Sequence, residues 1–158
     1  MILAGGTDKA RTQESILVAA TDLFVSNGYD GTTMRDIAEK AGVSRATVFW
    51  HFSDKASVFR ETLNRMLAPF RASLERSWDE VPLEERLEAQ LSVSEEFAVQ
   101  HGKEIFAVIT WALESPPLRS MVLDTLLDLN QRFGGMLAET VAELLPEEHE
   151  PRLAALAL

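Results

Sequence analysis

Thr32–Phe52 reads T-T-M-R-D-I-A-E-K-A-G-V-S-R-A-T-V-F-W-H-F and holds two short helical patterns separated by Gly42. Thr33 precedes the first pattern as a candidate N-cap, and Asp36 three residues later completes a variant of the capping box. Gly42 can adopt a positive φ and end that helix, and Ser44 can cap the second. Two helices joined by a short turn with a glycine are typical of a helix-turn-helix, whose second helix enters the DNA major groove.

The overall composition is that of an ordinary globular protein, with 158 residues that are 46% hydrophobic and 25% charged. No apolar run is long enough for a transmembrane helix, and the N-terminus has neither the basic segment nor the apolar segment of a signal peptide. Cysteine is absent, which excludes disulfides and Cys-based metal sites. We therefore expect a cytoplasmic location, no metal site and no cofactor.

The net charge of −10 is distributed unevenly along the chain. Residues 1–60 carry seven basic and seven acidic side chains, whereas residues 61–158 carry eight basic and 18 acidic ones. The candidate helix-turn-helix therefore lies in a neutral segment that precedes an acidic one. Any affinity for DNA must then come from a few well-placed cations rather than from a broadly basic face.

Amphipathic periodicity predicts a first helix that begins at Asp8 or Lys9, runs to Asn27 and is ended by Gly28, after a tail over residues 1–7.

A long helix is predicted after Phe52, with Ser53 as its cap and Asp54 in its first turn. It runs to about Asp79, and Pro69 is expected to kink it or to break it in two.

Helical patterns resume after Val81-Pro82 and continue to the end of the sequence. We expect helices over Leu83–His101, over Lys103–Glu114, which is apolar nearly all round and therefore buried, over Pro117–Leu145, and from Arg152 onward. Gly134-Gly135 within the third of these would permit close packing or a bend. No strand-like alternation is present, so the predicted fold class is all-α.

Gly28–Lys55, which reads G-Y-D-G-T-T-M-R-D-I-A-E-K-A-G-V-S-R-A-T-V-F-W-H-F-S-D-K, resembles the TetR family of one-component bacterial transcription regulators. The resemblance implies a three-helix helix-turn-helix DNA-binding domain over residues 1–54. It also implies a helical ligand-binding and dimerisation domain over residues 55–158, which is expected to lack the last two long helices of such bodies. Those helices form most of the family's dimer interface.

The function implied by the resemblance is that of a DNA-binding transcription regulator without enzymatic activity. It would be a homodimeric repressor that binds a palindromic double-stranded operator and is released by a small apolar or amphipathic effector. The alternative is a helical small-molecule-binding or scaffolding protein with weak or no DNA binding, which the acidic balance and Phe49 favour. A catalytic role for Ser44, His51 and Asp54 would require a pocket and an orienting partner, and an exposed helix-turn-helix offers neither.

Ten DNA-contacting residues follow from the resemblance. Thr33 and Arg35 would meet phosphates at the start of the second helix, and Lys55 would reach a phosphate from the fourth. The residues expected on or beside the groove are Ser44, Arg45, Ala46, Thr47, Phe49, Trp50 and His51. Arg45 is the best candidate for base recognition because arginine pairs bidentately with guanine, although a phosphate contact or a solvated surface charge is the alternative. Phe49 stands where the family usually has a tyrosine, so it cannot donate to phosphate.

The effector pocket is expected among the helices of the body, where apolar side chains alternate with a few polar ones. The residues expected to line it are Phe97, His101, Phe106, Thr110, Trp111, Glu114, Asn130 and Gln131. Packing in the core or exposure to solvent is the alternative for each of them. His101 and Glu104 are spaced as metal ligands could be, but no third ligand is nearby.

Overall fold

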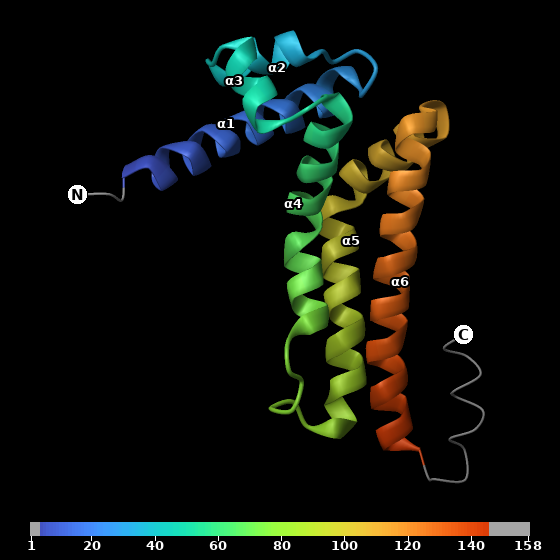
Figure 1. Cartoon of the computed structure of the whole chain (residues 1–158). Coiled ribbons are helices and arrows are strands. Elements are labelled where there is room, and N and C mark those ends of the chain that lie inside the picture. Colours follow the sequence, from blue (N-terminus) through green and yellow to red (C-terminus); the bar gives the residue numbers. More distant parts are fainter. Residues whose placement is uncertain (1–3, 146–158) are drawn as a thin grey trace. The chain divides into compact units, whose positions relative to one another are not determined.

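The computed structural model describes residues 4–145, and within them six helices follow one another without a strand (Figure 1). The helices are α1 (Ala4–Asn27), α2 (Met34–Ala41), α3 (Arg45–His51), α4 (Lys55–Glu75), α5 (Leu83–Glu114) and α6 (Pro116–Leu144). The predicted all-α fold class is confirmed. Among the helices of this described part, none combines the length and the apolarity that crossing a bilayer requires.

The chain forms two compact units, and three of the helices contribute to both. The first unit consists of the described part of Met1–Met66 together with Phe106–Arg119. The second consists of Leu67–Ile105 together with the described part of Ser120–Leu158. The proposed end of the DNA-binding domain at Asp54 remains a prediction, and the compact unit around it extends further along α4 and includes the end of α5.

The capping box at the start of α2 is formed as predicted. The Asp36 amide donates to Thr33 Oγ1 at 3.2 Å, and the Thr33 amide donates back to Asp36 Oδ2 at 2.9 Å. The Thr33 hydroxyl also donates to Asp36 Oδ2 at 2.7 Å, and these hydrogen bonds from Thr33 lower the pKa of the Asp36 carboxyl. The first turn of α2 is thus held by side chains that are three residues apart in sequence.

The turn between α2 and α3 also has the predicted chemistry. Gly42 has φ 68° and ψ 29°, a left-handed conformation that ends α2, and its amide donates to the carbonyl oxygens of Ala38 and Glu39. Ser44 then caps α3, because its hydroxyl accepts the Thr47 amide at 3.0 Å.

An aromatic cluster forms the core of the first unit, with one ring from α1, one from the loop after it and one from α4. The ring centroids of Phe24 and Tyr29 lie 5.7 Å apart, and that of Phe59 lies 5.5 Å from Phe24 and 5.4 Å from Tyr29. Trp111 on α5 extends the cluster, since its ring lies edge-on to Phe59 at 6.2 Å. Ile37 of α2 and Val48 of α3 are fully buried in the same unit.

The starts of two helices differ from the prediction. Helix α1 begins at Ala4, so residues 4–7 are helical rather than part of a tail. Helix α4 is capped by Asp54 instead of Ser53, because Asp54 Oδ1 accepts the Ser57 amide at 2.7 Å and Asp54 O accepts the Val58 amide at 3.2 Å. A carboxylate is a strong acceptor at a helix N-terminus, and the hydrogen bonds from Ser57 accordingly lower the pKa of Asp54.

Two predicted helix breaks are absent. Helix α4 continues through Pro69 but ends at Glu75 rather than near Asp79, and α5 continues through Gly102 as one 32-residue helix. Pro69 removes one backbone donor, and Gly102, which does not have a positive φ, costs only its weak helix propensity. The backbone hydrogen bonds of the neighbouring turns are therefore sufficient to keep α4 and α5 continuous.

The expectation that the end of α5 is buried all round is wrong for one side of the helix. Val108 and Ala112 are buried, whereas Phe106 is 72% exposed and Leu113 is 67% exposed. Helix α6 occupies nearly its predicted range, and the helix expected from Arg152 onward lies outside the described residues.

The second unit contains three helical segments that run side by side in Figure 1. Phe70 of α4 stacks on Phe97 of α5 at 4.9 Å and lies 6.1 Å from Phe133 of α6, so one side chain joins all three segments. A Cβ built on Gly134 or Gly135 meets no atom within 4 Å in the described structure, so the close packing that these residues permit is not used there.

Gly42 has a positive φ and Gly102 does not, so we expect opposite effects when each is replaced by alanine. Gly42→Ala should lower the free energy of unfolding by about 1 kcal/mol, because alanine disfavours the left-handed region. Gly102→Ala should raise it by up to about 1 kcal/mol, because alanine is the better helix former and a Cβ has open space there. Urea denaturation followed by circular dichroism measures both, and a change of the same sign in the two variants would contradict the assignment.

Candidate nucleic-acid interface

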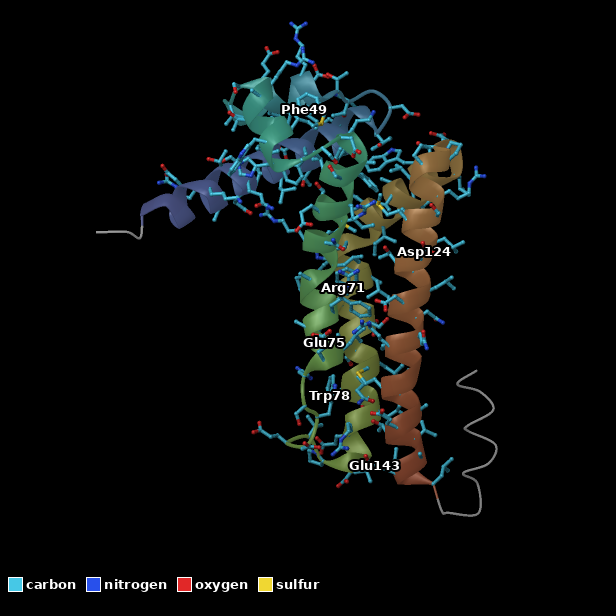
Figure 2. All side chains as sticks on the ribbon, in the orientation of Figure 1. Phe49, Arg71, Glu75, Trp78, Asp124 and Glu143 are labelled. Atoms are coloured by element: carbon cyan, nitrogen blue, oxygen red, sulfur yellow. The ribbon has the colours of Figure 1, made fainter. Side chains whose placement is uncertain are left out.

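Helix α3 is anchored on one face and open on the other. Val48 is fully buried and Phe52, just after the helix, is buried, whereas Arg45 and Ala46 are exposed. Two large aromatic side chains are also on the surface: Phe49, which Figure 2 labels, is 47% exposed, and Trp50 is 66% exposed. Adjacent exposed aromatics beside an exposed arginine indicate a surface that contacts a partner. Ser44 at the N-cap is exposed, and Thr47 and His51 are half-buried, so every residue predicted on this helix is on or beside the open face.

Thr33 and Arg35 are exposed at the start of α2, as a phosphate contact requires. The Thr33 hydroxyl is already committed, since it donates to Asp36 and accepts the Asp36 amide. Within residues 4–145, Arg35 makes no hydrogen bond or ion pair, and its positive charge helps to lower the pKa of the Asp36 carboxyl. Arg35 is therefore the freer of the two for a phosphate.

Lys55 has a structural contact that the sequence did not indicate. Its Nζ donates to the Tyr29 carbonyl oxygen at 2.7 Å and lies 4.1 Å above the Tyr29 ring. Burial lowers the pKa of Lys55, and Asp30 partly opposes that effect. Burial likewise raises the pKa of the Tyr29 hydroxyl, and Asp54 and Asp30 raise it further. An ammonium has three donor hydrogens, so Lys55 can hold the loop before α2 and still donate to a phosphate.

Lys9 is a basic side chain that the sequence reasoning missed at this interface. Its Nζ lies 4.7 Å from the centre of the Trp50 ring, which brings the first turns of α1 beside the end of α3. His51 lies against the same ring, with 4.8 Å between the ring centroids. Burial lowers the pKa of His51, and the positive charge of Lys9 lowers it further. The only signal in the sequence that could have identified Lys9 is its positive charge near the start of the first amphipathic helix.

The residues predicted for the effector pocket are distributed over both units. Trp111 and Glu114 line a cavity of about 140 Å³ in the first unit, beside Gly28, whose φ is 74°. Gln131 lines a larger cavity of about 510 Å³ in the second unit. The remaining predicted residues, which line neither of these two cavities, are Phe97, His101, Phe106, Thr110 and Asn130.

Those remaining residues have packing or surface roles in the described structure. Phe97 stacks on Phe70 and lies 4.7 Å from the His101 ring. Thr110 donates its hydroxyl to the Phe106 carbonyl oxygen at 2.9 Å, and Asn130 is exposed. Across residues 4–145, no set of three or more His, Cys, Asp and Glu side chains is arranged to hold a metal ion.

Sequence comparison identifies relatives over part of the chain. Residues 16–62 match the sequence model of a family described as "Bacterial regulatory proteins, tetR family". The chain is 37% identical over 76 residues to the HTH-type transcriptional regulator SrpR of Pseudomonas putida, and 37% identical over 62 residues to the HTH-type transcriptional repressor BepR of Brucella suis. These matches cover 44% and 39% of this chain but only 36% and 30% of the relatives, so well under two thirds of either relative is matched.

Solved structures extend the likeness beyond the helix-turn-helix. A transcriptional regulator from Aquifex aeolicus VF5 superposes with a TM-score of 0.65 and 27% identity, over 92% of this chain and 84% of that one. NalD, the secondary repressor of the MexAB-OprM multidrug efflux pump in Pseudomonas aeruginosa, superposes with a TM-score of 0.58 and 27% identity, over 85% and 69% of the two chains. The helix-turn-helix match and the shared helical fold lead to one conclusion: the chain is similar to the TetR family of bacterial regulatory proteins, in sequence over residues 16–62 and in fold over most of its length.

Proposed function

We propose that this protein is a one-component transcription regulator that represses its targets by binding a palindromic operator and is released by a small molecule. The observation that carries the proposal is the capped helix-turn-helix, whose second helix exposes Arg45, Phe49 and Trp50 on one face. The names of the relatives support it, since both matched proteins are called transcriptional regulators or repressors.

Binding would follow the docking geometry of helix-turn-helix proteins. Helix α3 enters the major groove with its N-terminal residues at the base edges, which brings Arg45 to a position where it can pair with guanine. Arg35, Lys9 and Lys55 supply the phosphate contacts around it. Because the first 60 residues have no net charge, these side chains carry most of the electrostatic affinity.

The palindrome implies a homodimer, since two copies of α3 must reach successive major grooves about 34–36 Å apart. The dimer would have two states, one in which this separation fits DNA and one in which it does not. An effector that binds the second state more tightly would shift the equilibrium toward it and release the operator. The protein would need no enzymatic activity for this cycle.

The DNA-binding proposal can be tested by selecting binding sites from a random duplex library and measuring affinity by fluorescence anisotropy. Arg45→Ala should relax the preference at one base pair of each half-site, at a cost of about 1–3 kcal/mol. Lys9→Ala should weaken binding to all sequences alike and reduce the salt dependence by about one counterion. Lys103→Ala, which removes an exposed cation of α5, is the matched control and should have no effect. If no sequence is enriched at low salt, the protein is not a sequence-specific regulator.

DNA affinity should depend on pH through His51. The pKa of His51 in the free protein is below its ordinary value of 6.5, and a nearby phosphate would raise it in the complex. Binding then takes up a proton, so affinity should increase as the pH falls from about 8 to about 6. Without DNA the lowered pKa has the opposite consequence for stability. The unfolded chain binds a proton at His51 more readily than the folded first unit does, so the free energy of unfolding decreases as the pH falls below 6.5 through the pKa of His51. Anisotropy measures the pH dependence of DNA affinity, and thermal unfolding measures that of stability. Both should weaken in the His51→Gln variant, and an unchanged pH dependence would exclude His51 as its source.

A further inference from the structure

The start of α1 has little packing of its own to hold its side chains in place. Residues 8–11 are exposed, and the first buried side chain after them is that of Ile16. The Thr12 hydroxyl donates within the helix, to the Asp8 carbonyl oxygen at 2.9 Å. In Figure 1 the first turns of α1 extend beyond α3. A cation on these turns therefore has a fixed position only if a group outside α1 contacts it.

Trp50, near the end of α3, supplies such a contact for Lys9. The Lys9 Nζ lies 4.7 Å from the centre of the Trp50 ring, within the distance of about 6 Å over which a ring face attracts a cation. Tryptophan is the side chain whose ring attracts cations most strongly. The Lys9 charge also contributes to the lowered pKa of His51, which is consistent with an ammonium at this end of α3.

The Trp50 ring is available for this contact because it does not anchor α3. Val48 and Phe52 are the buried anchors, whereas Trp50 is 66% exposed. The adjacent Phe49 is exposed as well, but within residues 4–145 no cation lies over its ring. The two neighbouring aromatic side chains therefore differ, since one of them carries an ammonium and the other does not.

We propose that Trp50 is a positioning residue whose ring holds the Lys9 ammonium beside the end of α3, where the ammonium meets one phosphate of DNA. An ammonium has three donor hydrogens, so Lys9 keeps its contact with the ring while it donates to a phosphate oxygen. A lysine held in this way gives up less side-chain entropy on binding than a freely rotating one does. The inference rests on the proposed DNA binding, and it has Trp50 act through Lys9 rather than by a groove contact of its own.

A double-mutant cycle on the full chain tests the proposal, with affinities measured by fluorescence anisotropy. Lys9→Met removes the charge but keeps the length of the side chain, and Trp50→Leu removes the ring. The loss of affinity caused by Lys9→Met should be about two- to fivefold smaller when Trp50 is replaced by leucine, which corresponds to an exposed cation–π contact. The accompanying decrease in salt dependence, about one counterion with Trp50 present, should also be smaller.

The cycle is measured on the selected duplex and on a scrambled duplex at low salt. The coupling should be the same on both, because a phosphate contact carries no sequence information. If Lys9→Met has the same effect with and without the ring, or a larger effect without it, Trp50 does not position Lys9 and the inference is wrong.

Phe49→Leu is the matched control, since it is the same kind of change at the neighbouring exposed ring. Its effect should add to that of Lys9→Met without coupling, and a coupling equal to that of Trp50→Leu would contradict the specific role of Trp50. Trp50→Phe keeps a ring face and should retain part of the coupling. Because these positions are exposed, thermal unfolding should confirm that every variant folds.

The contact can also be measured without DNA, which separates this inference from the proposed function. Protons above an aromatic ring resonate upfield, so the Lys9 ε-methylene signal should lie upfield and return to an ordinary position in the Trp50→Leu variant. An ordinary Lys9 signal in the unchanged chain would contradict the inference even if DNA is bound as proposed. If the chain binds selected and scrambled duplexes equally, the proposed regulator is wrong, whereas a coupling on both duplexes still supports the role of Trp50.

Discussion

The hydrogen bond from Lys55 to the Tyr29 carbonyl oxygen, together with the aromatic cluster beneath it, is the constraint on which the first unit depends. Tyr29 belongs to the loop that leads into α2, and Phe59 belongs to α4. One ammonium and two rings therefore hold the segment before the helix-turn-helix to the helix after it. Burial of the Lys55 charge carries a desolvation cost, seen in its lowered pKa, which the carbonyl and the ring face offset.

Contacts between lysines and aromatic rings would help residues 1–60, which have no net charge, to bind a polyanion in the proposed complex. Lys9 and Lys55 both lie over aromatic rings, on Trp50 and Tyr29 respectively. A lysine that is held in place before binding loses less side-chain entropy when it meets a phosphate than a freely rotating one does. In the proposed complex, a few ordered cations would then serve where a broadly basic surface would otherwise be needed.

Local features of this protein were predictable from sequence, and features that depend on distant packing were not. The roles of Thr33, Gly42 and Ser44 follow from hydrogen bonds and dihedral angles within a few residues, so the pattern was sufficient. The continuity of α5 through Gly102 depends on the balance between weak propensity and neighbouring turns, which composition does not reveal. The cavity of about 510 Å³ in the second unit could not be predicted, because Trp78, Gln90 and Glu143, which line it, come from segments whose proximity only the fold establishes. Lys9 was missed for the same reason.

The reciprocal capping at α2 has a consequence for ion selectivity. Many helix N-termini take up phosphate or sulfate because their amide groups are unpaired. Here Asp36 supplies an intramolecular anion that occupies this position, with its carboxylate on the Thr33 amide and hydroxyl. Free inorganic phosphate would have to displace a tethered carboxylate of high effective concentration. In the proposed complex, a DNA strand would bind at many points at once and would approach the adjacent Arg35 without displacing Asp36. In the proposed complex, the start of α2 would therefore discriminate a polymeric phosphate backbone from soluble phosphates.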